Sequence, residues 1–192
     1  MKANVCHSDI VAMVDTREQD PFDLSPMQTE LGTLHVGDYS VVGLESVIAI
    51  ERKSLPDLVA CCGRERERFQ RELDRLRGWP VSAIVIECSW GEIQRGNWRS
   101  KLTPGQVQAS LESFIAQGHA IVMAETHETA ARLTRGILFY AARYRWREAR
   151  SMVKRIRQAD QLRLEQEKAD RRQPIGFQTD LKPATSIKRI IR

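Results

Sequence analysis

The sequence predicts an α/β fold in which a central mixed β-sheet is flanked by helices and followed by a long basic C-terminal helix. Short apolar runs occupy residues 10–14, 47–50, 81–87 and 120–125, and segments with helical spacing lie between them. An arginine-rich stretch follows residue 142. Strands that alternate with helices in this way form a sheet with helices on its faces.

The first strand is expected at residues 10–14, where a β-branched apolar run ends at Asp15. A loop rich in Pro and Asp follows. Residues 33–42 are interpreted as two short strands bent at Gly37. Residues 47–50 are apolar at every position, which is typical of a central strand that is covered on both faces.

A helix is predicted to begin at Ser54, because Ser54 can cap it, Pro56 is tolerated in the first turn and Asp57 suits the positive end. Apolar residues then recur at helical spacing to about Gly78, with Gly63 able to divide the segment into two helices. Residues 81–87 are expected to form another buried strand.

Residues 88–103 are predicted to be a loop that holds Trp90 and Trp98. Elements expected after it are a helix from Pro104 to about Gln117, a strand at 120–125 and a helix from about Thr126 that nothing breaks before Pro174. We therefore predict a body at 1–145, a basic helical extension at 146–173 and a flexible tail at 174–192.

Composition narrows the class of protein. Apolar residues make up 42% of the 192 residues and charged residues 29%, which is typical of a soluble globular chain. No apolar run approaches the roughly 20 residues of a membrane span, and the N-terminus lacks a secretory signal. We therefore expect no membrane partner and a cytoplasmic location, associated with the nucleoid if the protein is bacterial or viral. The four cysteines form no CxxC pair, which argues against a zinc site.

Charge is distributed unevenly along the chain. Residues 1–142 carry 15 Lys/Arg against 19 Asp/Glu, a net charge of −4, whereas residues 143–192 carry 15 against 6, a net charge of +9. An acidic body followed by a basic segment suggests that the segment meets a polyanion. The alternative is a solvated charged helix that binds nothing.

Acidic residues follow the ends of several predicted strands. Asp15 closes the first strand, Asp38 follows a glycine, and Glu51 ends the central strand with Lys53 two residues later. Side chains two apart on a strand share a face, so Glu51 and Lys53 are expected to point into one space and Arg52 away from it. Carboxylates with a lysine suit metal-assisted hydrolysis of a phosphodiester, with Mg²⁺ or Mn²⁺ as the cation.

The stretch GDYSVVGLESVIAIERKSLPD at residues 37–57 resembles the GD…ERKxxxD signature of the XPF-type structure-specific endonucleases, whose nuclease domains include those of XPF and archaeal Hef. VDTRE at residues 14–18 is similar to a second element of that family, and the resemblance extends over residues 10–145. It implies a restriction-endonuclease-like fold and an XPF-type nuclease domain.

The resemblance also implies roles for individual residues. Asp38 and Glu51 correspond to the metal-binding carboxylates, Asp15 to a further carboxylate at the metal, and Lys53 to the catalytic lysine. The supporting residues of the motifs are Arg17, Glu18, Arg52 and Asp57. For Arg17 and Arg52 a structural ion pair is as plausible as a phosphate contact, and Asp57 can equally serve as a charge at a helix N-terminus.

DNA is the expected partner. Arg64 and Arg68 are candidates for phosphate contacts, although pairing with nearby glutamates explains much of that segment. Trp90 and Trp98 could stack on an unpaired base, but packing is the simpler interpretation. The basic segment contributes the remaining candidates, which are Arg143, Arg145, Arg147, Arg150, Lys154, Arg155 and Arg157.

The leading hypothesis is a metal-dependent DNA endonuclease that acts on branched or structured DNA in repair, recombination or replication. The alternatives are a catalytically silent DNA-binding subunit and a restriction-type enzyme that reads a duplex site. We find neither the tandem helix-hairpin-helix domain nor the helicase domain of the family. A homodimer is expected, with the apolar stripe Leu133, Ile137, Tyr140 and Tyr144 as its contact or, alternatively, as core.

Overall fold

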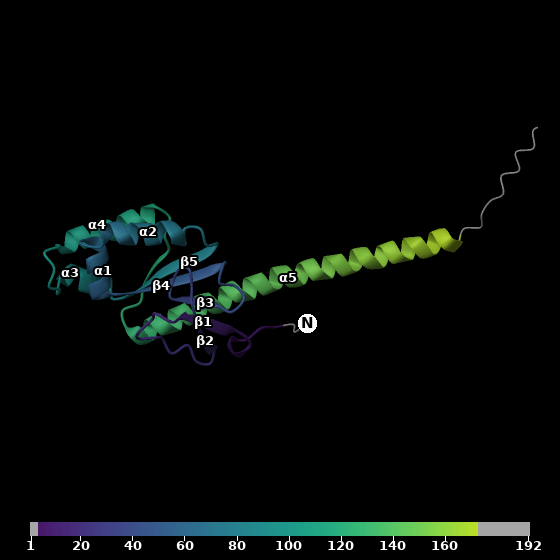
Figure 1. Cartoon of the computed structure of the whole chain (residues 1–192), viewed down its shortest axis with the longest axis horizontal. Helices are drawn as coiled ribbons and strands as arrows, with labels where there is room; N and C mark the ends of the chain where they lie inside the picture. The colour runs from purple at the N-terminus through teal and green to yellow at the C-terminus, as the bar shows by residue number, and fades with distance from the viewer. Residues whose placement is uncertain (1–3, 173–192) are drawn as a thin grey trace, which may run out of the picture. The chain divides into compact units, whose positions relative to one another are not determined.

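A six-stranded sheet is the centre of the computed structural model, which describes residues 4–172 (Figure 1). The strand order is β2-β1-β3-β4-β5-β6. β1 is parallel to β2, β3 is antiparallel to β1 and β4, and β4, β5 and β6 are parallel. The strands are β1 Val11–Asp15, β2 Gln28–Gly32, β3 Tyr39–Val41, β4 Ile48–Ser54, β5 Val81–Glu87 and β6 Ile121–Met123. The predicted mixed sheet is confirmed, with β4 in a central position.

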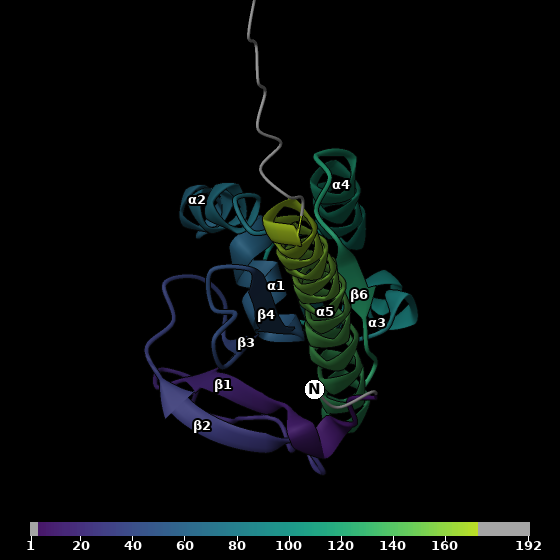
Figure 2. The ribbon, with the colours of Figure 1, turned by 90° about the vertical axis from the view of Figure 1, so that its right-hand side faces the viewer.

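Helices cover both faces of the sheet (Figures 1 and 2). Ile48 and Ile50 of β4 belong to the core shared with the first turns of α5, whereas Ala49 belongs to the core shared with α1, α2, α3 and α4. This alternation follows from the two-residue period of a strand. The helices are α1 Leu55–Cys62, α2 Arg66–Leu76, α3 Trp90–Arg95, α4 Pro104–Ala116 and α5 His127–Arg172, with a short 3-10 helix at His7–Asp9.

Helix boundaries follow the capping residues. The Ser54 hydroxyl accepts a hydrogen bond from the Asp57 amide at 3.3 Å, and Gly63 follows the last residue of α1. The long C-terminal helix is confirmed, because α5 is continuous from His127 to Arg172. The chain forms one compact unit from Met1 to Ala149 and a second from Arg150. The predicted domain boundaries stay predictions, and the predicted tail at 174–192 lies outside the described residues.

Two predicted elements are wrong. Residues 33–38 contain no strand. The strand that precedes them, β2, was not predicted, because four of its five residues are exposed and show no apolar pattern. The predicted loop at 88–103 contains α3. Ser89 and Glu92 cap this helix reciprocally, since the Ser89 hydroxyl accepts from the Glu92 amide at 3.1 Å and the Glu92 carboxylate from the Ser89 amide at 2.7 Å. No helix within residues 4–172 is long and apolar enough to cross a membrane.

Candidate active site

The turn at Gly37 brings Asp38 to the central strand. Gly37 has a φ of +77°, and a Cβ atom there would lie 3.0 Å from the Ile50 carbonyl oxygen, so both the backbone conformation and the close approach favour glycine. The Asp38 amide donates to the Ile50 carbonyl at 2.8 Å, and the Arg52 amide donates to Asp38 Oδ2 at 2.8 Å. The Asp38 carboxylate is therefore held against the backbone that flanks Glu51.

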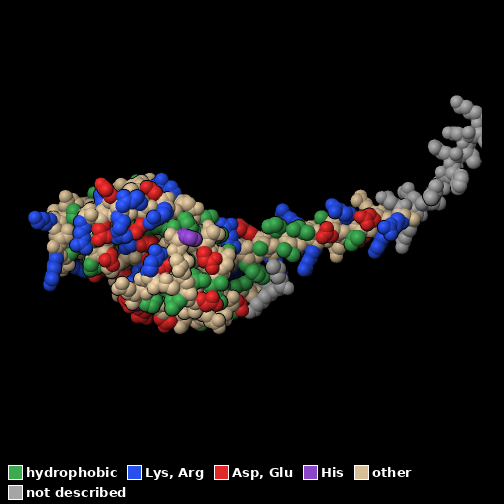
Figure 3. All heavy atoms as spheres, viewed as in Figure 1, with side chains coloured by type: hydrophobic (Ala, Val, Ile, Leu, Met, Phe, Trp, Pro, Cys, Tyr) green, Lys and Arg blue, Asp and Glu red, His purple; other side chains and the backbone are tan. Residues whose placement is uncertain are grey.

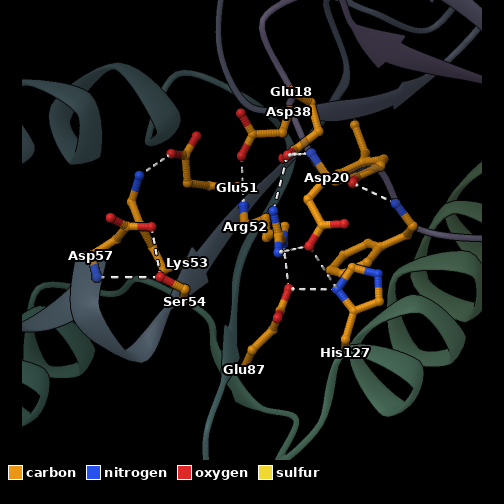
Figure 4. Close-up of polar contacts among 12 residues, drawn as sticks. Glu18, Asp20, Asp38, Glu51, Arg52, Lys53, Ser54, Asp57, Glu87 and His127 are labelled. Carbon is orange, nitrogen blue, oxygen red and sulfur yellow. Dashed lines mark hydrogen bonds and ion pairs between the residues drawn. The ribbon is translucent and has the colours of Figure 1, made fainter.

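Asp38, Glu51 and Lys53 line one cavity of about 270 Å³. Glu51 and Lys53 lie on the same face of β4, as their spacing predicts, and the Lys53 ammonium donates to Glu51 Oε1. The close-up in Figure 4 shows this contact and the separate direction of Arg52. The other lining residues are Arg17, His35, Val36, Gly37, Arg68, Glu72, Arg75 and Leu76.

Asp38 and Glu51, two of the three carboxylates that line the cavity, hold protons more tightly than usual. Burial raises the pKa of Asp38 to about 7, and the neighbouring Glu51 carboxylate contributes to the shift. Burial also raises the pKa of Glu51, although Lys53 opposes this effect. Two desolvated carboxylates at one site repel each other and favour either a proton or a cation between them. The site therefore has the electrostatic character of a cation-binding site.

Lys53 lies between two carboxylates. Burial alone would lower its pKa, but the Glu51 carboxylate raises it overall, so the ammonium stays charged. Its Nζ is also 3.9 Å from Glu72 Oε2, a buried oxygen that accepts no hydrogen bond. Sequence reasoning missed Glu72, whose i,i+4 spacing from Arg68 is that of an ordinary ion pair along a helix. That pair exists at 2.6 Å, but it uses the other carboxylate oxygen.

Arg52 lies on the opposite face of β4, in a cluster of carboxylates (Figure 4). Its guanidinium contacts Glu18 Oε1 at 2.9 Å, Asp20 Oδ2 at 3.0 Å and Glu87 Oε1. Glu87 stands on the same face of the adjacent strand β5, and His127 Nδ1 lies 3.4 Å from its Oε1. Of the two interpretations of Arg52, the structure supports the ion pair. The cluster connects four parts of the fold, which are the loop after β1, β4, β5 and the start of α5.

The Asp15 carboxylate accepts hydrogen bonds from its own turn and from the segment after β2. Its carboxylate accepts bonds from the Arg17 side chain at 2.6 and 2.9 Å and from the amides of Arg17 and Leu34 at 2.8 and 2.7 Å. The Arg17 side chain lowers the pKa of Asp15 to about 2. Asp15 does not line the cavity, but its amide donates to the Asp38 carbonyl at 2.9 Å. Asp15 therefore holds the segment that carries Asp38.

The structure brings only some of the other predicted residues to the cavity. Arg68 lines it, and Lys and Arg side chains gather over the part of the surface that α2 forms (Figure 3). Asp57 is exposed and bonded to Ser54 at the start of α1, and Arg64 lines a different cavity. On α5, Arg143 lies 5.9 Å from the Phe139 ring and Arg145 pairs with Glu148 at 3.0 Å. The remaining basic candidates are the exposed Arg147, Arg150, Lys154, Arg155 and Arg157.

Within residues 4–172, no group of three or more His, Cys, Asp or Glu side chains is arranged to hold a metal ion by itself. Mg²⁺ does not need such a group, because it is commonly bound by one or two carboxylates together with waters and substrate phosphates. Asp38 and Glu51 supply that donor set, and their raised pKa values give them a reason to bind a cation. The residues present therefore fit Mg²⁺ or Mn²⁺.

Comparison with known proteins identifies the domain. The ERCC4 domain matches residues 14–137, which include the last two residues of β1, the Asp38 turn and all the residues that line the cavity. The chain belongs to the ERCC4 domain family. Two solved structures of XPF from Aeropyrum pernix, one of them a complex with DNA, are similar to this chain with a TM-score of 0.57 and 18% identity. No curated protein sequence matches it.

The structural matches cover 69% of this chain, which spans only 62% and 65% of the two XPF chains. They establish that this ERCC4 domain has the restriction-endonuclease-like fold that the sequence predicts. The Asp38 turn and the ERK segment of β4 both lie within the residues that the family model matches.

We expect divalent cations to stabilise the fold. A cation at 100 times its dissociation constant adds about 2.7 kcal/mol to the free energy of unfolding, which corresponds to a rise of about 5–10 °C in Tm for a domain of this size. A melting curve with and without Mn²⁺ at pH 7.5 measures this rise. Glu51→Gln should remove most of it, and an equal rise in that variant would contradict the assignment of Glu51 as a ligand.

Proposed function

We propose that this protein is a divalent-metal-dependent DNA endonuclease that hydrolyses phosphodiester bonds in branched or structured DNA during repair, recombination or replication. The supporting observation is the convergence of Asp38, Glu51 and Lys53 on one cavity of an ERCC4 domain. A catalytically silent subunit would have no need for two desolvated carboxylates beside a buried lysine, so the composition of the cavity favours the enzyme.

In this proposal Asp38 and Glu51 hold Mg²⁺ or Mn²⁺, which when bound stabilises charge on the phosphate and lowers the pKa of a water molecule. Lys53, which is charged beside Glu51, orients the attacking water or offsets negative charge as it develops. Glu72 provides a second carboxylate for Lys53 when Glu51 binds the cation. Arg17 and Arg68 can contact the phosphates that flank the scissile bond.

Asp15 acts indirectly in this scheme. Its four hydrogen bonds leave it poorly placed as a metal ligand, so we assign it the role of positioning Asp38 and Arg17. Glu18 is likewise a positioning residue, because its carboxylate holds Arg52, whose amide holds Asp38. Asp57 caps α1.

Basic residues of α5 are proposed to contribute affinity for DNA without reading its sequence. Changing exposed Lys154, Arg155 and Arg157 to glutamine should lower affinity and flatten the dependence of log K on log salt by roughly 0.9 for each phosphate contact that is lost. Fluorescence anisotropy with a labelled duplex at several salt concentrations measures both quantities. Unchanged affinity and slope would mean that this part of α5 is only a solvated helix.

A homodimer is proposed on the evidence of an exposed apolar surface. Tyr140 and Tyr144 of α5 are 55% and 63% exposed, and with Leu133 and Ile137 they line an open hollow of about 530 Å³ beside Val81. Large apolar side chains in such a group mark an interaction surface more often than a free one. Sedimentation at micromolar concentration should give the mass of a dimer, and Tyr140→Glu should give a monomer. A monomeric wild-type mass would overturn this part of the proposal.

The proposed activity is tested with a panel of labelled DNAs that comprises duplex, single strand, flap, fork and four-way junction, each incubated with Mg²⁺ or Mn²⁺. We expect internal cuts in at least one branched substrate and little cutting of the plain duplex. Tight binding without any cut would favour the silent subunit. Cuts at a defined sequence in plasmid DNA would favour the restriction-type enzyme.

A further inference from the structure

A second cavity, distinct from the one that holds Asp38, lies beside the start of α1. Its volume is about 540 Å³, which is large enough for one nucleotide. We call it the Trp98 pocket. The residues that matter for its chemistry are Leu55, Pro56, Arg64, Asn97, Trp98 and Arg99.

Close packing and a side-chain hydrogen bond hold the segment that carries Trp98 in place. Gly96 ends α3 with a φ of +67°, where a Cβ atom would collide with Pro104 at 2.8 Å. The Trp98 indole donates to the Leu102 carbonyl at 2.8 Å, and the Leu102 side chain packs over Gly63 so closely that a Cβ there would lie 2.9 Å from it. The indole is therefore fixed in orientation and half-buried, which is the state of a preformed binding wall rather than of a mobile loop.

The lining combines apolar surfaces with positive charge. Leu55, Pro56 and Trp98 provide flat or aliphatic walls, and Arg64 and Arg99 stand at the edge with exposed side chains. The Arg64 side chain is 81% exposed, and its Nε lies 3.5 Å from Glu65 Oε1. A surface ion pair of this kind contributes little to stability. In Figure 3, Lys and Arg side chains project at the end of the body where the α3–α4 connection lies. An aromatic platform flanked by arginines matches a nucleobase and its phosphates.

The pocket is close to the candidate active site along the chain. Leu55 follows Lys53 by two residues, so their Cα atoms are at most about 7 Å apart. Arg64 of the pocket and Arg68 of the active-site cavity are four residues apart, and both contact Glu65.

We propose that the Trp98 pocket binds one unpaired nucleotide of the DNA substrate, with its base against Trp98 and its phosphates near Arg64 and Arg99. This inference rests on the proposed function and names a feature of the substrate. A base inside a duplex must first be unstacked and unpaired before it can enter a pocket, whereas a base at a branch is already free. The pocket therefore selects DNA in which a single strand begins near the scissile phosphate.

The test is an abasic scan of a labelled fork, in which each unpaired nucleotide in turn lacks its base. Affinity is measured with Ca²⁺ in place of Mg²⁺, so that binding is recorded with little cleavage. In the wild type, we expect the loss of one base near the junction to weaken binding about tenfold, because stacking of one base on an aromatic ring is worth about that factor. In Trp98→Leu this penalty should disappear, while Trp98→Phe should keep part of it.

Arg99→Ala serves as a second variant, because its side chain is exposed and its loss should not affect folding. It should weaken binding to the fork about fivefold or more and binding to the blunt duplex much less. Lys101→Ala is the matched control, since it removes an equal charge two residues away and outside the pocket.

A flat abasic scan in the wild type, or equal penalties in wild type and Trp98→Leu, would overturn the proposal. So would equal losses on fork and duplex in Arg99→Ala, which would indicate only general attraction. Cleavage of the same fork by the wild type in Mg²⁺ reports on the nuclease activity separately, so failure of the pocket and failure of the proposed function are distinguishable.

Discussion

Asp38→Asn is expected to lower the rate of DNA cleavage by about three orders of magnitude and, in the absence of metal, to make the fold more stable at pH 8. The rate falls because the bound cation supplies several kcal/mol of transition-state stabilisation and each 1.36 kcal/mol is a factor of ten. Asparagine keeps the shape and the acceptor oxygen for the Arg52 amide, so the turn at Gly37 should survive.

The gain in stability follows from the raised pKa of Asp38, which is about 7 in the folded protein and 3.8 as the ordinary value. Above pH 4 the unfolded carboxyl ionises while the folded one stays protonated, so the free energy of unfolding of the wild type falls as pH rises toward 7 and then levels off. Asparagine cannot ionise and should remove the part of this decline that comes from Asp38, while the part that comes from Glu51 remains. At 1.36 kcal/mol for each pKa unit, the expected gain at pH 8 is about 4 kcal/mol, or about 8–16 °C in Tm for a domain of this size.

Melting curves from pH 5 to pH 8 in EDTA, together with single-turnover cleavage rates in Mg²⁺, measure both effects. Exposed Asp74 on α2 offers a matched control, because Asp74→Asn makes the same chemical change outside the cavity. That control should cleave at the wild-type rate. An Asp38→Asn protein that is inactive and also less stable at pH 8 would indicate misfolding and would remove the support for a metal ligand.

Arg52→Met is expected to lower the free energy of unfolding by about 3–5 kcal/mol. Its guanidinium is the shared partner of Glu18, Asp20 and Glu87, and the Glu18 and Glu87 side chains are only 8% and 12% exposed. Removing the cation leaves these carboxylates buried and close together. Arg52→Lys should recover only part of the loss, because an ammonium cannot reproduce the planar fork that meets three carboxylates.

Urea denaturation of wild type, Arg52→Met and Arg52→Lys measures these differences. Arg71→Met on α2 is the control, since Arg71 is exposed and its replacement should cost less than about 0.5 kcal/mol. A loss of that small size in Arg52→Met would argue that the cluster is a surface network, and the phosphate-contact interpretation of Arg52 would become the better one.

Elements with a strong local pattern could be predicted from the sequence. β4 and β5 are apolar runs with β-branched residues, and α1 carries a Ser-x-Pro-Asp start, so their positions were determined by local chemistry. β2 could not be found in this way, because its exposed side chains show no period and its position depends on backbone pairing with β1. α3 was recognisable in principle from the Ser-x-x-Glu capping box at Ser89.

The same distinction between local patterns and distant contacts applies to the candidate site. The shared face of Glu51 and Lys53 follows from strand geometry, and the approach of Asp38 to β4 follows the glycine that precedes it. Contacts between distant segments could not be predicted. The meeting of Glu72 with Lys53 depends on how α2 packs on the sheet, and the cluster around Arg52 depends on Glu87, which lies 35 residues away in the sequence.

Cleavage of an end-labelled fork at enzyme excess, with wild type, Glu51→Gln and Glu112→Gln prepared in parallel, tests the assignment of the catalytic cavity most directly. Glu112 is exposed on α4, and its substitution is the matched control. We predict internal cuts by wild type and Glu112→Gln in Mg²⁺, none in EDTA, and none by Glu51→Gln under either condition. Equal cutting by Glu51→Gln and wild type, or cutting by the wild type in EDTA, would contradict a metal-dependent nuclease site built on Asp38 and Glu51.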